Sequence, residues 1–346
     1  MKKLFLAVLA VAALAACKKD VLVQQQDGTA IAFGSAFVDN VTRASDPTAV
    51  GDPSTTTHTI ESMHVWGFMD KPSGYVFRGK EVTKDADGKW TYSPIQYWFP
   101  GHVYYFAAVS PYDDNKVKVE AASEDALKGL GTITFDNVDG NTDLLYSATT
   151  VSTVGKSVND TYDPVAFTFN HLLSKIKFTF RNGFEAEANH FLKVTNIRMA
   201  APKKGSINVA QSDWWSSNEW EIDQNGGTMV LKFGDVNKGE SIHPNTSSRS
   251  DLMHFVIPTD DTVTYDVAFD VELWLNDVKA IRSTLRTTIT GVAFEIGKAY
   301  NLKAEIGPEN ISPDGPLKPI EFSAEVKAWE YGPTPDEYHG NGTVIY

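Results

Sequence analysis

Residues 262–275 read Thr-Val-Thr-Tyr-Asp-Val-Ala-Phe-Asp-Val-Glu-Leu-Trp-Leu and alternate large apolar side chains with mostly polar ones. The apolar set occupies every second position from Val263 to Leu275. Successive side chains of a β-strand point to opposite faces of a sheet, whereas a helix does not keep a period of two. This stretch therefore predicts a long strand with one buried face.

The same alternation occurs elsewhere in the chain. It recurs at residues 116–120, 175–180, 299–306 and 320–328. Turn signals such as Asp87-Gly88 and Asn182-Gly183 separate these runs. Only residues 123–130 favour a helix, with Ser123 as its N-cap. Many short strands and almost no helix predict an all-β fold built from β-sandwiches.

Two domains are expected from the length of 346 residues. The stretch Thr149–Asp163 is polar and rich in Ser, Thr, Val, Asn and Gly, which is typical of a connection between domains. We therefore predict an N-terminal β-sandwich at residues 44–160 and a C-terminal β-sandwich at residues 161–346.

The first 17 residues have the form of a bacterial lipoprotein signal. Lys2 and Lys3 precede an apolar run that ends at Cys17, the single cysteine of the chain. The run is too short to span a membrane comfortably and fits a secretory signal. We expect residues 1–16 to be removed and Cys17 to carry lipid in the outer membrane. An ordinary signal peptide with a chance cysteine is the alternative.

Residues 17–43 read as a propeptide that contains a removable strand. Between Thr29 and Val41 the large side chains share one face and small residues share the other. Arg43 follows, and then a linker rich in Ser, Thr, Pro, Asp and Gly. A trypsin-like protease would reach the Arg43–Ala44 bond easily. The alternative is an accessible arginine with no programmed role.

The C-terminal end mirrors this arrangement. A polar loop with Pro and Gly leads into the short β-prone segment Thr343, Val344, Ile345 and Tyr346. This segment is a candidate donor strand for a neighbouring molecule. It is equally well interpreted as a terminal strand of the protein's own sheet or as a frayed end.

Three tryptophans lie close together among polar residues, at Trp214, Trp215 and Trp220. Such a cluster is a candidate ligand surface, for example for stacking on sugars. Packing in a core or between domains is the alternative.

Composition and motifs argue against several functional classes. The net charge is −13 and no basic run occurs, so nucleic acid is not an expected partner. No Gly-x-Ser-x-Gly, His-Glu-x-x-His or P-loop motif is present. The histidines are scattered without metal-ligand spacing, and His64, His102 and His254 fall in strand-like runs. We therefore expect no enzymatic activity, no metal site and no cofactor.

Several phrases of the chain, together with the lipoprotein signal and the Arg-Ala site, resemble the fimbrillins of Bacteroidales type V pili. They are Asp87-Gly88-Lys89-Trp90, Tyr97-Trp98-Phe99-Pro100, Tyr105-Phe106-Ala107-Ala108, Asp143-Leu144-Leu145-Tyr146 and Phe169-Asn170-His171-Leu172-Leu173-Ser174-Lys175-Ile176. The resemblance implies two tandem transthyretin-like β-sandwich domains. It also implies export as a lipoprotein, cleavage after an arginine and polymerisation by strand exchange.

Two functions are therefore expected from the sequence. The first is a structural subunit of a cell-surface fimbria, with other pilus subunits as its partners in a homo- or heteropolymer. The second is a surface-anchored or pilus-tip adhesin that binds a glycan or a host protein. The fimbrial subunit would begin in the outer membrane and end in the extracellular fimbria.

Overall fold

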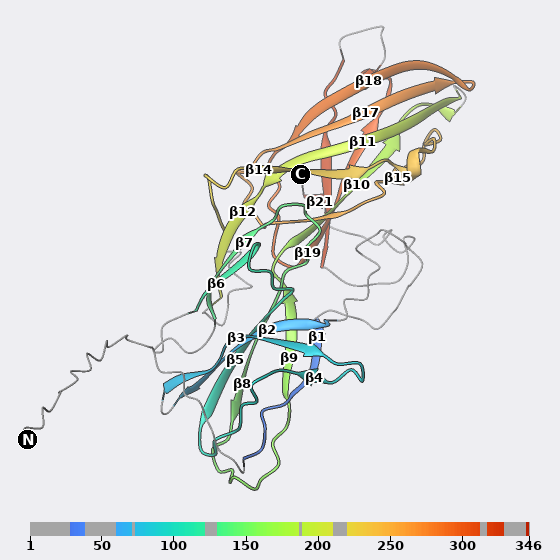
Figure 1. The fold of residues 1–346 in the computed structure, drawn as a ribbon. Helices are drawn as coiled ribbons and strands as arrows, with labels where there is room; N and C mark the ends of the chain where they lie inside the picture. The colour runs from blue at the N-terminus through green and yellow to red at the C-terminus, as the bar shows by residue number, and fades with distance from the viewer. Residues whose placement is uncertain are drawn as a thin grey trace, which may run out of the picture.

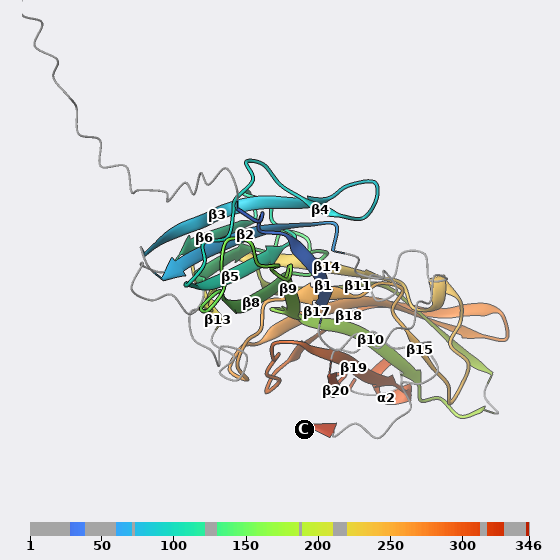
Figure 2. The ribbon, with the colours of Figure 1, turned by 90° about the horizontal axis from the view of Figure 1, so that it is seen from below.

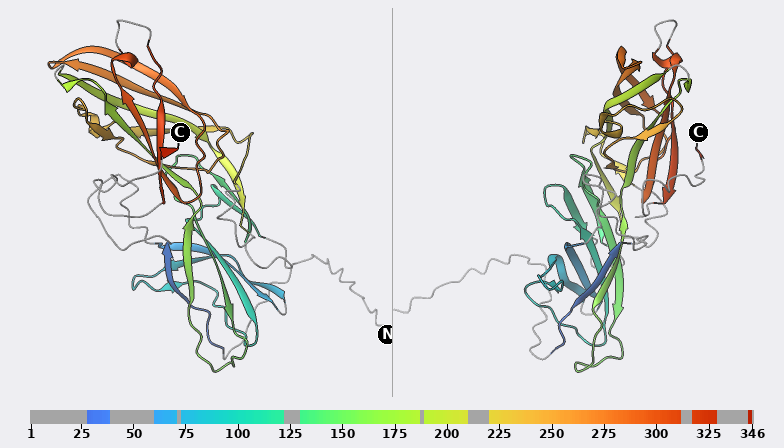
Figure 3. Two further views of the ribbon diagram at one scale, coloured as in Figure 1. Left: turned by 180° about the vertical axis from the view of Figure 1, so that it is seen from behind. Right: turned by 90° about the vertical axis from the view of Figure 1, so that its right-hand side faces the viewer.

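Strands dominate the computed structural model, which describes residues 28–38, 60–70, 73–121, 130–186, 189–209, 220–311, 317–328 and 344–345. They form four sheets. Two sheets make a first lobe around one hydrophobic core, and two make a second lobe around another. The lobes follow one another along the long axis of the molecule and remain distinct in the views from behind and from the side (Figures 1 and 3).

The first lobe contains a seven-stranded and a four-stranded sheet. The larger sheet has the order β1 (Phe33–Val38), β9 (Val165–His171), β8 (Leu145–Ser152), β5 (Val103–Ser110), β2 (Ser62–Asp70), β3 (Ser73–Lys84) and β4 (Trp90–Thr91). The smaller sheet has the order β13 (Trp220–Ile222), β12 (Lys204–Asn208), β7 (Gly131–Asp136) and β6 (Val117–Ala121).

The second lobe contains a six-stranded and a four-stranded sheet. The larger sheet runs β15 (Ser247–Arg249), β10 (Ser174–Asn182), β19 (Lys298–Ile306), β20 (Phe322–Ala328) and β21 (Val344–Ile345), with β16 (His254–Val256) also paired to β10. The smaller sheet runs β14 (Thr228–Gly234), β11 (His190–Pro202), β17 (Tyr265–Leu275) and β18 (Val278–Ile289). Within the described ranges, the helical elements are η2 (Asn237–Gly239) and α2 (Pro308–Ile311).

The alternation predicted for residues 263–275 is confirmed in β17. Its side chains from Tyr265 to Leu273 alternate between buried and more exposed positions. The buried face packs on the larger sheet of the same lobe, where the rings of Phe269 and Phe180 lie 4.8 Å apart. Apolar contact between two sheets is the driving force for this layered arrangement. The all-β fold predicted from the sequence is therefore confirmed.

The central strand β10 departs from the predicted alternation. Lys175 and Thr179, which the pattern placed on the outer face, are only 4% and 9% exposed. Strand β10 is flanked by β19 on one side and by β15 and β16 on the other. Side chains of a central strand are covered by those of its neighbours, as when Thr179 Oγ1 donates a hydrogen bond to Asn301 Oδ1 at 2.7 Å.

The stretch Thr149–Asp163 does not separate the two lobes. Strands β8 and β9, on either side of most of it, pair with each other in the same sheet. The chain instead passes from the first lobe to the second between His171 and Ser174. It then returns, because β12 and β13 belong to the first lobe. A polar loop within one sheet and a linker between domains have the same composition, which is why the pattern misplaced this boundary.

Trp220, at the start of β13, is part of the first hydrophobic core. Its side chain is 8% exposed, and its Nε1 donates a hydrogen bond to the Leu172 carbonyl oxygen at 2.8 Å. Leu172 follows β9 directly, at the crossing between the lobes. The indole therefore fixes the returning segment β12–β13 against the point where the chain leaves the first lobe.

Replacement of this indole tests that assignment. Trp220→Phe should lower the free energy of unfolding by about 2–3 kcal/mol, because the Leu172 carbonyl loses its partner and the core loses volume. Urea denaturation followed by circular dichroism would measure it. Trp90→Phe, in the hairpin between β3 and β4, is the matched control and should cost less than about 1 kcal/mol. Equal losses in the two variants would contradict the assignment.

Candidate assembly site

The leading segment, residues 28–38, occupies one edge of the seven-stranded sheet. Strand β1 lies parallel to β9, with Phe33 opposite Val165 and Val38 opposite Phe169. The Val165 N–H donates to the Ala32 carbonyl oxygen at 2.8 Å. Parallel pairing joins segments that are far apart in sequence, so this edge is filled by a part of the chain that precedes the rest of the lobe.

The residues just before β1 pair on their other side with the segment that follows β4. Ala30 and Tyr97 form an antiparallel bridge. The Ile31 N–H donates to the Gln96 carbonyl at 2.8 Å, and the Trp98 N–H donates to the Thr29 carbonyl at 2.9 Å. The leading segment therefore spans from β9 to residues 96–98 and satisfies backbone groups on both sides (Figures 1 and 2).

Two apolar side chains anchor the segment in the core. Ile31 and Phe33 are 1% and 7% exposed, whereas Ala30 and Ala32 on the other face are exposed. The predicted alternation is confirmed at these positions. The Phe33 ring stacks on Phe167 of β9 at 6.0 Å and meets Phe77 of β3 edge-on at 5.5 Å. Phe33 therefore fills the space between strands that are not neighbours in the sheet.

Tyr92 holds the backbone of the leading segment. Its hydroxyl donates a hydrogen bond to the Ile31 carbonyl at 2.6 Å, and its ring meets Phe33 edge-on at 5.6 Å. Burial of the phenol raises the pKa of Tyr92 to about 12. Sequence reasoning missed this residue, because no local pattern indicates a hydrogen bond to a segment 61 positions away.

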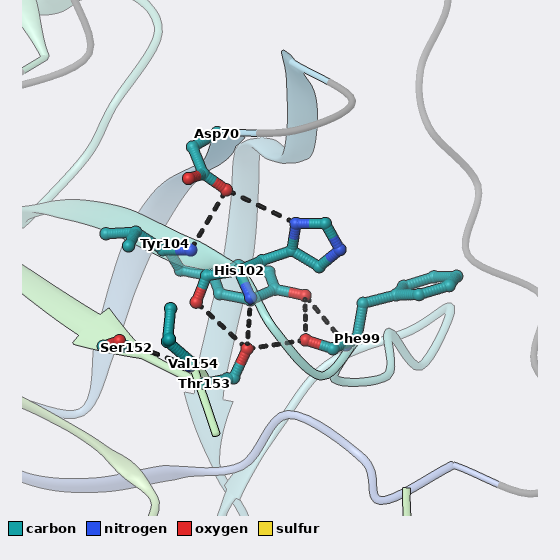
Figure 4. Close-up of polar contacts among 8 residues, drawn as sticks. Asp70, Phe99, His102, Tyr104, Ser152, Thr153 and Val154 are labelled. Carbon is teal, nitrogen blue, oxygen red and sulfur yellow. Dashed lines mark hydrogen bonds and ion pairs between the residues drawn. The ribbon is translucent and has the colours of Figure 1, made fainter. Parts of the chain in front are cut away.

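The receiving side is fixed by contacts that do not involve the leading segment (Figure 4). Thr153 Oγ1 donates to the Phe99 carbonyl at 2.7 Å and accepts from the His102 N–H at 2.9 Å. Asp70 Oδ1 accepts from the Val103 N–H at 3.0 Å. These bonds hold the loop that follows Trp98 and involve none of residues 28–38.

The C-terminal strand β21 lies at the edge of the six-stranded sheet in the second lobe. It pairs antiparallel with β20, with Ile345 opposite Ala324 and Val344 opposite Glu325. Strand β21 lies on the outside of this lobe (Figure 3). Val344 and Ile345 therefore extend the protein's own sheet here, as in one of the alternatives for this segment. Thr343 and Tyr346 lie outside the described residues.

The other predicted site residues divide into two groups. Cys17, Arg43, Ala44, Trp214 and Trp215 lie outside the described residues. Trp220 is buried, which agrees with the packing alternative and leaves its indole inaccessible to a ligand.

The histidines that fall in strand-like runs make local contacts. His64 stacks on Tyr112 at 4.3 Å, and His254 Nε2 lies 2.8 Å from the Lys232 carbonyl oxygen. Within the described part of the chain, no group of three or more His, Cys, Asp or Glu residues could hold a metal ion. Nor is any helix of that part long and apolar enough to cross a membrane.

Comparison with known families identifies the chain. A family model described as fimbrillin-like matches residues 42–329. The chain belongs to the fimbrillin-like family. Among curated proteins, none matches it. Membership gives this fimbrillin-like chain a pilus-related structural or adhesive role at the cell surface, in association with other pilus subunits and without enzymatic activity.

Solved structures share the fold of this fimbrillin-like chain. A fimbrial protein from Bacteroides vulgatus is similar with a TM-score of 0.55 and 14% identity, over 87% of this chain and 99% of that one. A putative cell adhesion protein from Parabacteroides distasonis is similar with a TM-score of 0.51 and 11% identity, over 88% and 97% of the two chains. The fimbrial anchor protein Mfa2 from Porphyromonas gingivalis is more distant, with a TM-score of 0.38 and 11% identity over 87% and 98%.

The anchoring role of Phe33 can be measured directly. Phe33→Ala should weaken the docking of the leading segment by about 3–5 kcal/mol, because the ring leaves a cavity among four aromatic neighbours. Amide hydrogen exchange of residues 29–38 should accelerate strongly. Ala30→Ser, an exposed position on the same segment, should leave exchange unchanged. Unaltered protection in Phe33→Ala would show that the ring does not hold the segment.

Alkaline titration of tyrosine reports whether residues 28–38 are docked on the edge of the first lobe. Because burial raises the pKa of Tyr92, its neutral hydroxyl stabilises the docked segment fully below about pH 10, and this contribution is lost as the pH rises through about 12. A chain that begins at Ala44 should therefore ionise one more tyrosine near pH 10 than the full chain. Spectrophotometric titration would measure this, and Tyr92→Phe in both forms should remove most of the difference. Identical titration curves would contradict it.

Proposed function

We propose that this protein is a structural pilus subunit, exported as a lipoprotein on Cys17, cleaved after Arg43 and polymerised by strand exchange. The observation that carries the proposal is the position of residues 28–38. They complete a sheet of the first lobe through non-covalent contacts, and Arg43 lies in the sequence between them and Ile60, where the described chain resumes. A single cut there would separate the segment from the body covalently.

The energies are of the size that strand exchange needs. Each backbone hydrogen bond between the segment and its neighbours contributes about 0.5–1.5 kcal/mol net. Burial of Ile31 and Phe33 adds about 1.5–3 kcal/mol each. Loss of the segment would leave unpaired groups on β9 and at residues 96–98, beside an apolar groove lined by Phe77 and Phe167. An edge of this kind binds another strand by β-augmentation.

The C-terminal strand is a suitable donor because its own pairing is short. Strand β21 makes two register pairs with β20, whereas β20 makes seven with β19. Release of β21 therefore costs few ladder hydrogen bonds and leaves β20 in its sheet. Val344, Ile345 and the terminal Tyr346 would supply apolar side chains to the groove of a neighbouring molecule.

Cleavage would also end the membrane attachment. Lipid on Cys17 would hold the uncut precursor in the outer membrane, with more than one acyl chain for stable anchoring. A cut after Arg43 separates Cys17 from the body, so one event would both free the subunit and vacate the acceptor edge. The fimbria would then lie outside the cell.

Arginine replacement tests the switch. Arg43→Ala should leave a lipid-linked monomer that retains residues 28–38, because a trypsin-like protease needs the basic side chain. Mass spectrometry of the surface fraction and electron microscopy of fimbriae would measure the outcome, with Thr42→Ala as the control that should still be cut and assemble. Deletion of Thr343–Tyr346 should allow cleavage and prevent polymerisation. Fibres of normal length from Arg43→Ala would contradict the proposal.

An adhesive subunit is the second candidate. It is favoured by the shared fold with a structure described as a putative cell adhesion protein, at a TM-score of 0.51. A surface-anchored adhesin would keep its lipid and remain uncut, and a tip adhesin would be cut but would carry an exposed ligand surface. The state of Arg43 in fimbriae from cells separates the anchored form from a polymerised subunit.

A further inference from the structure

The outer face of the sheet β14–β11–β17–β18 is basic on an otherwise acidic protein. The register places six basic strand residues on this side, which together we call the basic face: Lys193, Arg198, Lys232, Lys279, Arg282 and Arg286. Three acidic strand residues share it: Asp266, Asp270 and Glu272. The whole chain has 44 acidic and 31 basic Lys and Arg residues, so the charge balance is reversed here.

Two of the three carboxylates are already engaged. Asp270 accepts hydrogen bonds from Thr284 Oγ1 at 2.6 Å and Asn196 Nδ2 at 3.0 Å, and these bonds lower its pKa. Glu272 accepts from Lys279 Nζ at 3.3 Å and from Trp274 Nε1 at 3.2 Å. Burial opposes ionisation of Glu272, but these partners outweigh it and its pKa is lowered. Both carboxylates are ionised and already hydrogen-bonded to neighbouring side chains of the sheet. They therefore have little capacity left to bind an external cation or hydroxyl group.

Four cations of the basic face form no ion pair with any residue in the described ranges: Lys193, Arg198, Lys232 and Arg286. Elsewhere on the second lobe some cations are paired, as are Arg181 with Glu305 and Lys303 with Glu325. Lys232 and Arg286 are exposed and Lys193 and Arg198 are half-buried, and all four are available to an external anion at no cost in broken ion pairs.

Two of these cations lie on either side of a strand position that carries only a small side chain. Arg198 on β11 and Arg286 on β18 lie opposite Ala268, one on each side of β17. Neighbouring strands are about 4.8 Å apart, so the two arginine backbones are roughly 10 Å apart with only a methyl group between them. Two guanidinium groups in this arrangement can close on one carboxylate with paired hydrogen bonds.

Trp274 lies on the same face, six residues further along β17. This is roughly 20 Å from Ala268 at the rise of an extended strand. The Lys193 and Lys279 ammonium groups lie 5.0 and 5.8 Å from its ring centre. The side chains between the two ends are polar, with Asn196 and Thr284 bound to Asp270. Phe191 of β11 lies opposite Trp274, so the face combines anion-binding groups, hydroxyl and amide groups, and aromatic rings at one end.

We propose that the basic face binds an acidic polysaccharide, a sugar chain that carries carboxylates along its length. A protein partner fits less well, because the core of a protein interface is depleted in charged residues, whereas this face carries six basic and three acidic side chains. A sugar chain needs spaced charges, hydroxyl partners and an aromatic ring for stacking, all of which are present over this length. The basic face includes no residue of β1, β9, β20 or β21, so this binding is separate from subunit assembly and goes beyond it.

Binding of hyaluronate, a carboxylated polysaccharide, to the full chain at low ionic strength tests the proposal by isothermal titration calorimetry. The unaltered protein should bind hyaluronate but not neutral dextran, and added salt should weaken binding. The double variant Arg198→Gln, Arg286→Gln should bind about tenfold more weakly, since each exposed charge pair contributes modestly. The control double variant Lys118→Gln, Arg181→Gln changes the net charge equally on other surfaces and should bind within about twofold of the unaltered protein.

Thermal unfolding of both double variants should stay close to that of the unaltered protein, because Lys118, Arg181 and Arg286 are exposed and Arg198 is half-buried. Three results would overturn the proposal. One is the absence of hyaluronate binding by the folded, unaltered protein. Another is equal weakening in the two double variants, which would indicate attraction to the whole chain. The third is that the protein binds no hyaluronate but associates with itself, and that the double variant Arg198→Gln, Arg286→Gln abolishes this self-association. That result would assign the basic face to a second copy of the chain.

Discussion

The backbone edge of the first lobe that residues 28–38 cover is the constraint on which the rest of the structure depends. Strand β9 and residues 96–98 present N–H and C=O groups that need partners, beside the aromatic side chains Phe77, Tyr92 and Phe167 that surround Phe33. Residues 28–38 meet both needs at once, through backbone pairing on two sides and through Ile31 and Phe33 in the core. Backbone groups at such an edge cost free energy when nothing pairs with them. The segment that pairs with this edge therefore distinguishes one state of the molecule from another.

A continuous path of strands connects this edge to the other end of the molecule. Strand β1 pairs with β9, and β9 leads within three residues into β10. Strand β10 pairs with β19, β19 with β20, and β20 with the C-terminal β21. The crossing between β9 and β10 is braced by the buried pair of His171 and Asp143, at 2.9 Å, and by Trp220 on Leu172. In a polymer formed by strand exchange, β21 would leave β20, so this path would run from the acceptor strand β9 as far as β20. The covalent chain alone would connect β20 to the donated segment.

Particular residues show how much of the candidate site could be predicted. The alternation at residues 29–41 gave Ile31 and Phe33 as buried anchors, because period-two patterning is a local property of the chain. Tyr92, Gln96 and Thr153 were not predictable, since each contributes through a bond to a segment distant in sequence. The tryptophan cluster was ambiguous for the same reason, because the neighbouring residues in the sequence do not tell whether a tryptophan is exposed or buried. The pairing of β13 with β12 decided the position of Trp220.

The sequence by itself determined that the protein is built of strands, which faces of most strands are buried, and that a strand-like segment precedes the body. These properties follow from the alternation of side chains along an extended backbone, which needs no knowledge of partners. Only the tertiary structure decided which strands pair, that residues 149–163 fall within one sheet, and that six cations gather on one face of an acidic chain. Pairing and register depend on contacts between distant segments, and those contacts arise from packing of the whole chain rather than from any local stretch of it.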